Sequence, residues 1–467
     1  MTETATSDVV VVGCGMAGLS AANRAAELGL DVTVLEKSPK EDRGGHTAYS
    51  ESFRVPSTTA DLEQFGYEFA VPDYTPDDFY EDIMSQTSGR ADPDLARTLV
   101  EEAGEMIEWL TERGAEWDME PLNVGYTAAR TFMDGEENVA ALVEAAEADG
   151  ATFHYRSEAR GLLLDDDGSV AGVRARTDDG VVEFRADAVI VGAGGYESSP
   201  EMRTKYYGED YDAMKVRGSR YNTGEGIEML LDAGGKAEGQ WGGAHMALID
   251  ANSPDVEGGA NRVDGYQYGV IINKEGERFL DEGADARAHT YARFGHEIFE
   301  QPGHEAYIVV DAPLRDHMRA TGPSEVTVAD TVEELLAELG CDRPERGAET
   351  IRAFNEECDP DEFDPDVLDG NEATGVEPPK SNWALPLDEA PYYGWAVTGG
   401  ITFGFGGVAT DTRARVLDTV GRPIPGLYAA GNSVGGLFFD NYPGGTGLSN
   451  AAVYGKLAAE DASDYLG

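Results

Sequence analysis

The sequence predicts an α/β fold in which a domain built on a parallel sheet is interrupted by an inserted α+β domain. A buried β-branched strand, Val9–Val12, runs directly into a glycine-rich turn and an Ala-rich helix. Two later segments, 188–195 and 426–432, also place glycines after an apolar strand. The stretch 241–398 between them differs in character, with many aromatic residues and histidines. We therefore expect this stretch to be the insert, dividing the first domain into 1–240 and 399–467.

The glycines of the first turn have the spacing G-x-G-x-x-G, at Gly13, Gly15 and Gly18. The first permits a tight turn, the second lets the backbone approach a pyrophosphate, and the third lets helix and strand pack closely. The N-terminus of the next helix attracts the phosphate charge. A second strand, Val32–Leu35, ends in Glu36, at the spacing where a carboxylate meets a ribose hydroxyl. This setting predicts a Rossmann-like dinucleotide-binding domain.

The two later strand–glycine segments extend the predicted ligand site along the edge of the sheet. A simple nicotinamide site needs only the first crevice, so a ligand reaching all three segments must be longer, which favours FAD. The remaining pattern is mainly helical. Apolar residues at three- and four-residue spacing predict one amphipathic helix over 95–113. Further helices are expected over 331–339 and 448–459, and an irregular acidic loop over 359–372.

Charge excludes several classes of partner. The 467 residues include 35 basic and 89 acidic ones, a net charge of −54 spread over the whole length. Such a surface disfavours nucleic acid and anionic membranes and suits molar salt, where repulsion between carboxylates is screened, so we expect a halophilic protein. No apolar run approaches the roughly 20 residues of a membrane span and the N-terminus lacks a signal-peptide pattern, which predicts a cytoplasmic location.

The three cysteines, Cys14, Cys341 and Cys358, are too few and too scattered for a disulfide framework, an iron–sulfur cluster or a c-type haem site. Any redox chemistry is therefore expected to use an organic cofactor, and no metal site is expected.

Five motifs give the chain a family resemblance over nearly its full length: Arg43-Gly44-Gly45-His46-Thr47, and the segments 222–226, 276–285, 379–383 and 441–447. It resembles the flavoprotein family of succinate dehydrogenase, fumarate reductase and 3-ketosteroid Δ1-dehydrogenase, with FAD-dependent tricarballylate dehydrogenases as the nearest likeness. The resemblance implies an FAD domain with an inserted capping domain, and substrate held between them. It also implies oxidation or reduction of a C–C bond next to a carboxylate or carbonyl, with hydride exchanged at flavin N5.

The same resemblance implies four candidate catalytic residues, Arg287, His245, Tyr442 and Thr402. Arg287 occupies the neighbourhood of the proton-handling arginine of fumarate reductases, and His245 falls where relatives place a histidine for the substrate carboxylate. Tyr442, followed by Pro-Gly, resembles the tyrosine that polarises a carbonyl in ketosteroid dehydrogenases. The alternatives are a salt-bridge role for Arg287, a backbone-satisfied loop position for His245, and packing against the flavin for Tyr442.

The sequence departs from fumarate reductases at two positions. They carry a histidine before an M-G-G turn and an arginine before the last glycines, both for substrate carboxylates. This chain has Ile401-Thr402-Phe403-Gly404 and Tyr442-Pro443-Gly444 there, which argues against simple fumarate reduction.

Most cofactor-binding candidates lie in the glycine-rich turns and the segments that follow the strands. Gly444 to Ser449 would open the last helix toward the flavin N1/C2 carbonyl and stabilise its reduced form. His46 occupies the position at which membrane-bound succinate dehydrogenases attach flavin covalently, so it is a candidate either for covalent attachment or for a contact with the ring. The full set is Gly13, Gly15, Met16, Ala17, Gly18, Glu36, Lys37, Arg43, Gly44, Gly45, His46, Thr47, Ser50, Ala159, Ala193, Gly194, Asn222, Glu225, Gly431, Asn432, Gly447, Leu448 and Ser449.

The leading functional hypothesis is an FAD-dependent dehydrogenase or reductase of a small carboxylic acid, tricarballylate-like in kind, that passes electrons to a separate acceptor. Ketosteroid-like and fumarate reductase-like enzymes are the alternatives, followed by a flavoprotein subunit acting mainly within an electron-transfer assembly. A polycarboxylate pocket needs two or more cations and a steroid pocket is largely apolar, so the surroundings of His245, Arg287 and Arg130 discriminate.

Overall fold

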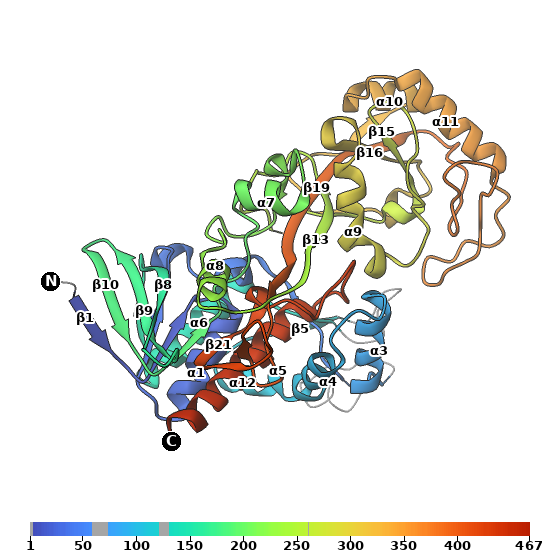
Figure 1. Ribbon diagram of the computed structural model, residues 1–467. Helices are drawn as coiled ribbons and strands as arrows, with labels where there is room; N and C mark the ends of the chain where they lie inside the picture. Colours follow the sequence, from blue (N-terminus) through green and yellow to red (C-terminus); the bar gives the residue numbers. More distant parts are fainter. Residues whose placement is uncertain (1–2, 58–72, 121–129, 260) are drawn as a thin grey trace. The chain divides into compact units, whose positions relative to one another are not determined.

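The structure is a computed structural model that describes residues 3–120, 130–259 and 261–467, except 58–72 (Figure 1). It divides into two compact units. The first consists of Met1–Leu122, Thr127–Ala244 and Thr402–Gly467, and the second mainly of His245–Ile401, in both cases apart from the undescribed residues.

A six-stranded sheet forms the centre of the first unit. Five of its strands are parallel, and β20 pairs antiparallel at one edge. In order across the sheet the strands are β20 (Arg415–Leu417), β21 (Pro423–Ala429), β11 (Ala188–Val191), β2 (Val9–Val12), β3 (Val32–Leu35) and β7 (Thr152–His154). The strands expected at Val9–Val12, at Val32–Leu35 and at the start of the segments 188–195 and 426–432 are thus all members of one sheet.

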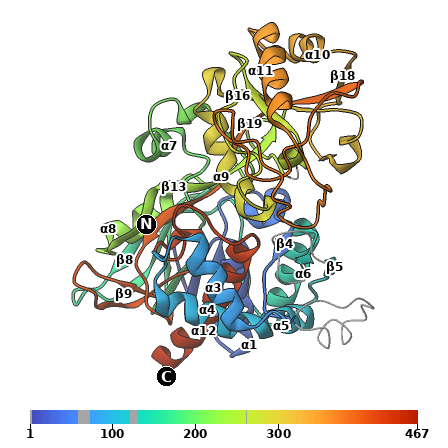
Figure 2. The ribbon, with the colours of Figure 1, turned by 90° about the vertical axis from the view of Figure 1, so that its right-hand side faces the viewer.

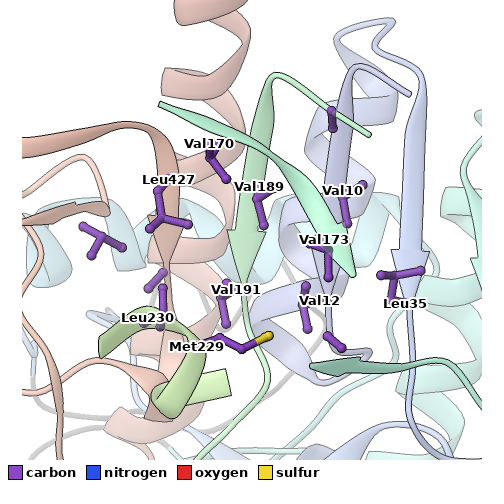
Figure 3. Close-up of a cluster of buried hydrophobic side chains, with 14 of the residues drawn as sticks. Val10, Val12, Leu35, Val170, Val173, Val189, Val191, Met229, Leu230 and Leu427 are labelled. Atoms are coloured by element: carbon purple, nitrogen blue, oxygen red, sulfur yellow. The ribbon is translucent and has the colours of Figure 1, made fainter. Parts of the chain in front are cut away.

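The apolar runs of β2 and β11 are buried on both faces, as their composition predicts. Val10 and Val12 point into a cluster with side chains of β9 and α8, including Val173 and Met229 (Figure 3). Val11 points the other way, toward Gly18 of α1. Helices α1 (Met16–Glu27) and α12 (Thr446–Leu466) pack against each other and against the sheet.

The rest of the first unit surrounds this sheet with two smaller sheets and short helices. The four-stranded sheet runs β1 (Glu3–Thr6), β10 (Gly180–Arg185), β9 (Val170–Thr177), β8 (Glu158–Leu164), and the three-stranded one β4 (Ser52–Phe53), β6 (Arg130–Phe132), β5 (Asp118–Glu120). The helices are α3 (Pro76–Gln86), α4 (Pro93–Glu102), α5 (Met106–Glu112), α6 (Gly135–Ala148), α7 (Pro200–Tyr207) and α8 (Glu225–Asp232).

The prediction of one continuous helix over 95–113 is wrong. The segment forms α4 and α5 with the 3₁₀ turn Ala103–Glu105 between them. Gly104 lies in this turn, and glycine is among the poorest helix formers. The apolar stripe still faces inward, with Leu99 and Leu110 buried, so the periodicity identified the face although the helix is broken. The last helix, α12, begins at Thr446 and continues to Leu466, longer than expected.

The second unit is built on an antiparallel sheet with helices beside it. Its strands are β13 (Ala237–Asp250), β15 (Val270–Asn273), β16 (Glu305–Val310), β18 (Thr327–Ala329) and β19 (Tyr392–Val408), with the pair β14 (Val263–Asp264) and β17 (Arg319–Ala320) separate. β13 and β19 begin or end in the first unit, where β12 (Lys215–Val216) pairs with β19. The helices are α9 (Arg287–Phe299), α10 (Val332–Leu339) and α11 (Pro344–Glu357).

Helix α10 confirms the helix expected over 331–339. Thr331 caps it, because its Oγ1 accepts the N–H of Glu334 at 3.2 Å. α10 packs against α11, β16 and β18 (Figure 2). The acidic segment 359–372 contains no helix or strand. Within the described ranges, none of the helices combines the length and apolar character that a membrane crossing requires.

Candidate active site

The carboxyl ends of β2, β3, β11 and β21 lead into segments that carry many of the predicted cofactor-binding residues. These strands are parallel, so their ends lie at one edge of the sheet, where open α/β sheets bind their ligands. The first glycine turn follows β2, Glu36 and Lys37 follow β3, Ala193 and Gly194 follow β11, and Gly431 and Asn432 follow β21. Others lie elsewhere: Ala159 is in β8 of the four-stranded sheet, Glu225 is the first residue of α8, and Gly447 to Ser449 are in α12.

The turn after β2 has no room for side chains at its outer glycines. Gly13 has a φ of +101°, and a Cβ there would lie 2.5 Å from the carbonyl oxygen of Gly192. A Cβ on Gly18 would overlap the carbonyl oxygen of Gly13. At Gly15 the nearest atom to a Cβ would be the Gly44 oxygen at 3.4 Å, which leaves a cradle beside the backbone. This is the division of roles that the motif predicts.

The start of α1 offers backbone donors to an anion. Thr47 Oγ1 accepts the N–H of Met16 at 2.8 Å. In the described part of the chain, the N–H groups of Ala17 and Gly18 donate no hydrogen bond, although both residues are buried. Two buried amide donors at a helix N-terminus favour a phosphate.

Glu36 is buried and oriented by the backbone. Its Oε2 accepts the N–H of Cys14 at 2.9 Å, and its Oε1 accepts the N–H of Ser38 at 2.7 Å. Burial raises the pKa of this carboxyl, while the two amides oppose the shift. Each oxygen has a further lone pair, so the carboxylate could still accept hydrogen bonds from two ribose hydroxyls.

Several buried polar atoms near these turns have no hydrogen-bond partner within the described residues. They are Arg43 Nε, both ring nitrogens of His46, and Thr446 Oγ1 at the first residue of α12. A buried polar group without a partner is costly, so their grouping at predicted cofactor positions indicates a missing polar ligand. The diphosphate, ribitol and isoalloxazine of FAD carry donors and acceptors for such atoms, and these residues therefore fit FAD.

Lys37 and Glu225 contact each other. Lys37 Nζ lies 2.9 Å from Glu225 Oε2 and also donates to Thr223 Oγ1, which joins the end of β3 to the start of α8. Asn222 lies against the glycine backbone, since a Cβ on Gly194 would come 2.6 Å from its Nδ2. These contacts hold the turns together whether or not the side chains also touch the cofactor.

Of the other predicted cofactor residues, Gly44 precedes the 3₁₀ turn Gly45–Tyr49, Gly45 begins it and Ser50 follows it. Ser50 Oγ donates to the backbone oxygen of His46 at 2.8 Å. Gly447, Leu448 and Ser449 lie in the first turn of α12, where Ser449 Oγ accepts the N–H of Arg54 at 3.1 Å. All of these residues are in the first unit.

Tyr442 lies in a group of four buried rings, Phe403, Phe405, Phe438 and Tyr442, which we call the aromatic group. The ring of Phe403 meets that of Tyr442 edge to face at 4.9 Å, and Phe438 meets Tyr442 at 5.6 Å. A Cβ on Gly447 would lie 3.5 Å from Phe403, so the aromatic group borders the start of α12. The neighbouring candidate Thr402 accepts a hydrogen bond from Arg217 Nη1 at 3.0 Å.

In the second unit, Arg287 is the first residue of α9 and is held from two sides. Its Nε and Nη2 lie 2.8 and 2.6 Å from Asp264 Oδ1. Its guanidinium lies 4.3 Å from the centre of the Tyr291 ring, and the same ring meets His245 edge to face at 5.1 Å. The fold thus joins two candidates, Arg287 and His245, through Tyr291. Arg130 lies in β6, and its side chain is outside the described part.

The sequence analysis missed Glu197, Asp264 and Tyr291. Tyr291 carried a usable signal, because it follows Arg287 by four residues, the spacing that places side chains on one helix face. Glu197 follows the glycines after β11, where a carboxylate stands out from its neighbours. Asp264 has no comparable signal, since only the folding of the second unit brings it to Arg287.

Comparison with known proteins identifies the family of the chain. The family model of the FAD binding domain matches residues 8–448. Urocanate reductase of Eggerthella lenta is 29% identical and covers 98% of this chain and 74% of its own length. The open conformation of a flavocytochrome c3 fumarate reductase has a TM-score of 0.77 at 26% identity, with 99% of this chain and 79% of that chain covered.

A 3-ketosteroid Δ1-dehydrogenase from Sterolibacterium denitrificans has a TM-score of 0.76 at 21% identity, covering 98% of this chain and 99% of that one, which shows a shared fold. The predicted α/β fold, family and FAD cofactor are confirmed, whereas the tricarballylate likeness, the halophilic character and the cytoplasmic location stay predictions. The chain belongs to the FAD-binding flavoprotein family of fumarate reductases and related enzymes, and it is an FAD-dependent oxidoreductase that acts on CH–CH groups.

Proposed function

We propose that the protein reduces or dehydrogenates a C–C bond next to the single carboxylate or carbonyl of a substrate whose remaining part is flat and apolar. The observation that carries the proposal is the aromatic group. It includes Phe403 and Tyr442, which lie in the two segments where fumarate reductases, by the resemblance, carry a histidine and an arginine for substrate carboxylates.

A carboxylate placed against this group would lose hydration without gaining an ion pair. Burying an unpaired charge is expensive, so the four rings disfavour a second carboxylate. A conjugated chain or ring, in contrast, is attracted to aromatic side chains through stacked and edge-to-face contacts. The Tyr442 hydroxyl adds a hydrogen-bond donor suited to a carbonyl oxygen. A urocanate reductase among the relatives acts, by its name, on a conjugated acid that bears a ring.

Within the second unit, His245 and Arg287 are the side chains suited to a carboxylate or carbonyl. FAD, when bound, supplies or accepts the hydride. Asp264 and Tyr291 fix the Arg287 guanidinium, which limits the entropy lost when it orients a carboxylate or carbonyl. An arginine keeps its charge at neutral pH, with a pKa above about 12, so it can move a proton only by receiving another at once. Asp264, in contact with two nitrogens of the same guanidinium, could supply that proton after taking one up from solvent.

A tricarballylate-like polycarboxylate is the second candidate. Arg262 Nε lies 3.7 Å from Asp264 Oδ2, so two arginines, Arg262 and Arg287, approach one carboxylate. Two cations could hold two substrate carboxylates. In either case we propose a small-molecule substrate and a separate electron acceptor.

Rapid mixing of the FAD-loaded enzyme with separate substrates tests the proposal through the flavin absorbance. The enzyme reduced with dithionite is mixed with an aryl acrylate, with fumarate and with a steroid enone, and the oxidised enzyme with tricarballylate and succinate. We expect the aryl acrylate to reoxidise the flavin at least about tenfold faster than fumarate, a difference of roughly 1.4 kcal/mol in barrier. Faster reaction with fumarate, or bleaching by tricarballylate, would overturn the apolar assignment.

Phe438→Ala provides a matched variant for the same experiment. Phe438 contacts Tyr442 but carries no polar atom, so its removal should slow the aryl acrylate more than fumarate. Phe294→Leu is the control, because this ring is buried in the second unit against Tyr266. An equal effect of Phe438→Ala on both substrates would indicate a packing role alone.

A further inference from the structure

We propose that Glu197 and His46 form a buried proton-accepting pair, which takes up one proton from solvent when the FAD of this unit is reduced. Neither residue is used by the substrate chemistry proposed above. The inference depends on FAD binding and is independent of the substrate.

The Glu197 carboxylate is completely buried and held by neutral groups. Oε1 accepts the N–H of Gly404 at 2.8 Å, and Oε2 lies 3.5 Å from Asn222 Nδ2. The Nε2 of His46 lies 4.0 Å from Oε2. Among the described residues, no lysine or arginine forms an ion pair with this carboxylate. Burial without an ion-pair partner favours the protonated form of a carboxylate.

The pair lies among the predicted cofactor residues. His46 follows Gly45, and a Cβ on Gly45 would lie 3.6 Å from the Asn222 side chain that also contacts Glu197. Neither ring nitrogen of His46 has a hydrogen-bond partner in the described chain. The backbone of Gly218 covers the ring, since a Cβ there would meet three of its atoms within 2.7 Å. The pair is therefore enclosed by protein and by the cofactor cradle.

The charged and titratable groups that face the pair allow it to bind one more proton. Arg203 donates to backbone oxygens, including that of Glu197 at 2.6 Å, and its charge lowers the pKa of the Glu197 carboxyl without cancelling the larger effect of burial. Burial and, to a smaller extent, Arg217 lower the pKa of His46, and Tyr196 and Tyr207 stay neutral because burial raises their pKa values. Burial raises the pKa of Glu197 to about 7 and lowers that of His46 to about 4.

Near neutral pH, His46 is thus neutral and Glu197 is partly ionised. Reduction of FAD by two electrons from substrate or dithionite adds negative charge nearby and raises the pKa of Glu197 further. One proton taken up from solvent then binds to the Glu197 carboxylate, whose Oε2 lies 4.0 Å from His46 Nε2. The carboxylate ends as a neutral carboxylic acid, and His46 ends neutral, as it began.

Proton uptake on reduction tests the pair directly. The holoenzyme is reduced electrochemically in weakly buffered solution with an indicator dye, one pH unit above the Glu197 pKa of about 7. We expect the wild type to take up about one proton more per FAD than Glu197→Gln. Asp461→Asn is the matched control, because Asp461 is also a largely buried carboxylate of this unit but pairs with Arg413 near the other end of α12. It should behave as the wild type.

A reduced-minus-oxidised infrared difference spectrum of the wild type keeps the test decisive if Glu197→Gln does not bind FAD. We expect a carboxylic-acid C=O band to appear on reduction, to shift in protein labelled with ¹³C-glutamate, and to be absent from the spectrum of any Glu197→Gln protein that binds FAD. Equal proton uptake in wild type and Glu197→Gln, or no labelled band in the wild type, would overturn the proposal.

Discussion

Gly18 lies inside α1, where alanine would ordinarily be the better helix former by about 1 kcal/mol. Here the close approach of the turn reverses that preference, because a Cβ would overlap the carbonyl oxygen of Gly13. We expect Gly18→Ala to lower the free energy of unfolding by about 2 kcal/mol or more and to reduce the FAD bound per chain. Urea unfolding and the ratio of flavin to protein absorbance measure both effects.

Gly104→Ala is the control for this substitution. A Cβ at Gly104 would have no atom within 4 Å, and the residue lies between α4 and α5. This variant should be as stable as the wild type or up to about 1 kcal/mol more stable, with normal FAD content. Full FAD binding by Gly18→Ala would show that the turn is not the pyrophosphate site.

Among single residues, the sequence points to those whose contacts follow from the local geometry of one motif. Gly13, Gly18 and Glu36 have fixed spacings along one strand–turn–helix unit, and the same unit sets their contacts in the structure. Glu197 and Asp264 could not be found in the same way. Glu197 accepts its hydrogen bond from Gly404, which is distant in the sequence. Asp264 reaches Arg287 only through tertiary folding.

The start of α12 shows how one element is positioned by another. Arg54, buried to 4% exposure, donates from Nε to the Gly444 oxygen at 2.9 Å and pairs through Nη1 with Asp82 of α3 at 2.7 Å. Its backbone N–H donates to Ser449 Oγ. This one side chain therefore ties α3 to the glycine turn before α12, and the turn sets where the helix N-terminus points.

Arg54→Met should therefore loosen this turn and weaken FAD binding. It removes one partner of a largely buried charge pair, a change that typically costs about 3 kcal/mol. Arg90→Met is the control, because Arg90 pairs with Asp440 at the surface with 46% and 44% exposure, and exposed pairs contribute under about 1 kcal/mol. Thermal unfolding and the dissociation rate of FAD measure the two variants. Equal losses in both would contradict the assigned role of Arg54.

Elements with strong periodic or β-branched patterns were predictable, while the antiparallel sheet of the second unit was not. β2, β3 and β11 are buried runs flanked by glycine or acid signals, and α10 has a Thr331 cap. β13 and β19 contain several glycines and mix polar with apolar residues, so neither alternation nor a continuous apolar run marks them. Their pairing is fixed by partners far along the chain.

At the scale of the whole molecule, the net charge of −54 dominates the response to solvent. Like charges repel in the folded state more than in the expanded unfolded chain, so low ionic strength should destabilise the protein. The ion pairs at the surface offset little of this, because 35 basic residues face 89 acidic ones and exposed pairs are individually weak.

Raising the salt concentration from about 0.1 M to about 1 M shortens the screening length from roughly 10 Å to 3 Å. We expect the midpoint of thermal unfolding of the FAD-loaded protein to rise by several degrees over this range, since each 1 kcal/mol shifts it by a few degrees. Potassium chloride and choline chloride at equal ionic strength should act alike if screening is the cause. If only sulfate stabilises the protein, surface exclusion of the salt explains the effect instead, and a midpoint that falls or stays level in chloride would contradict the electrostatic account.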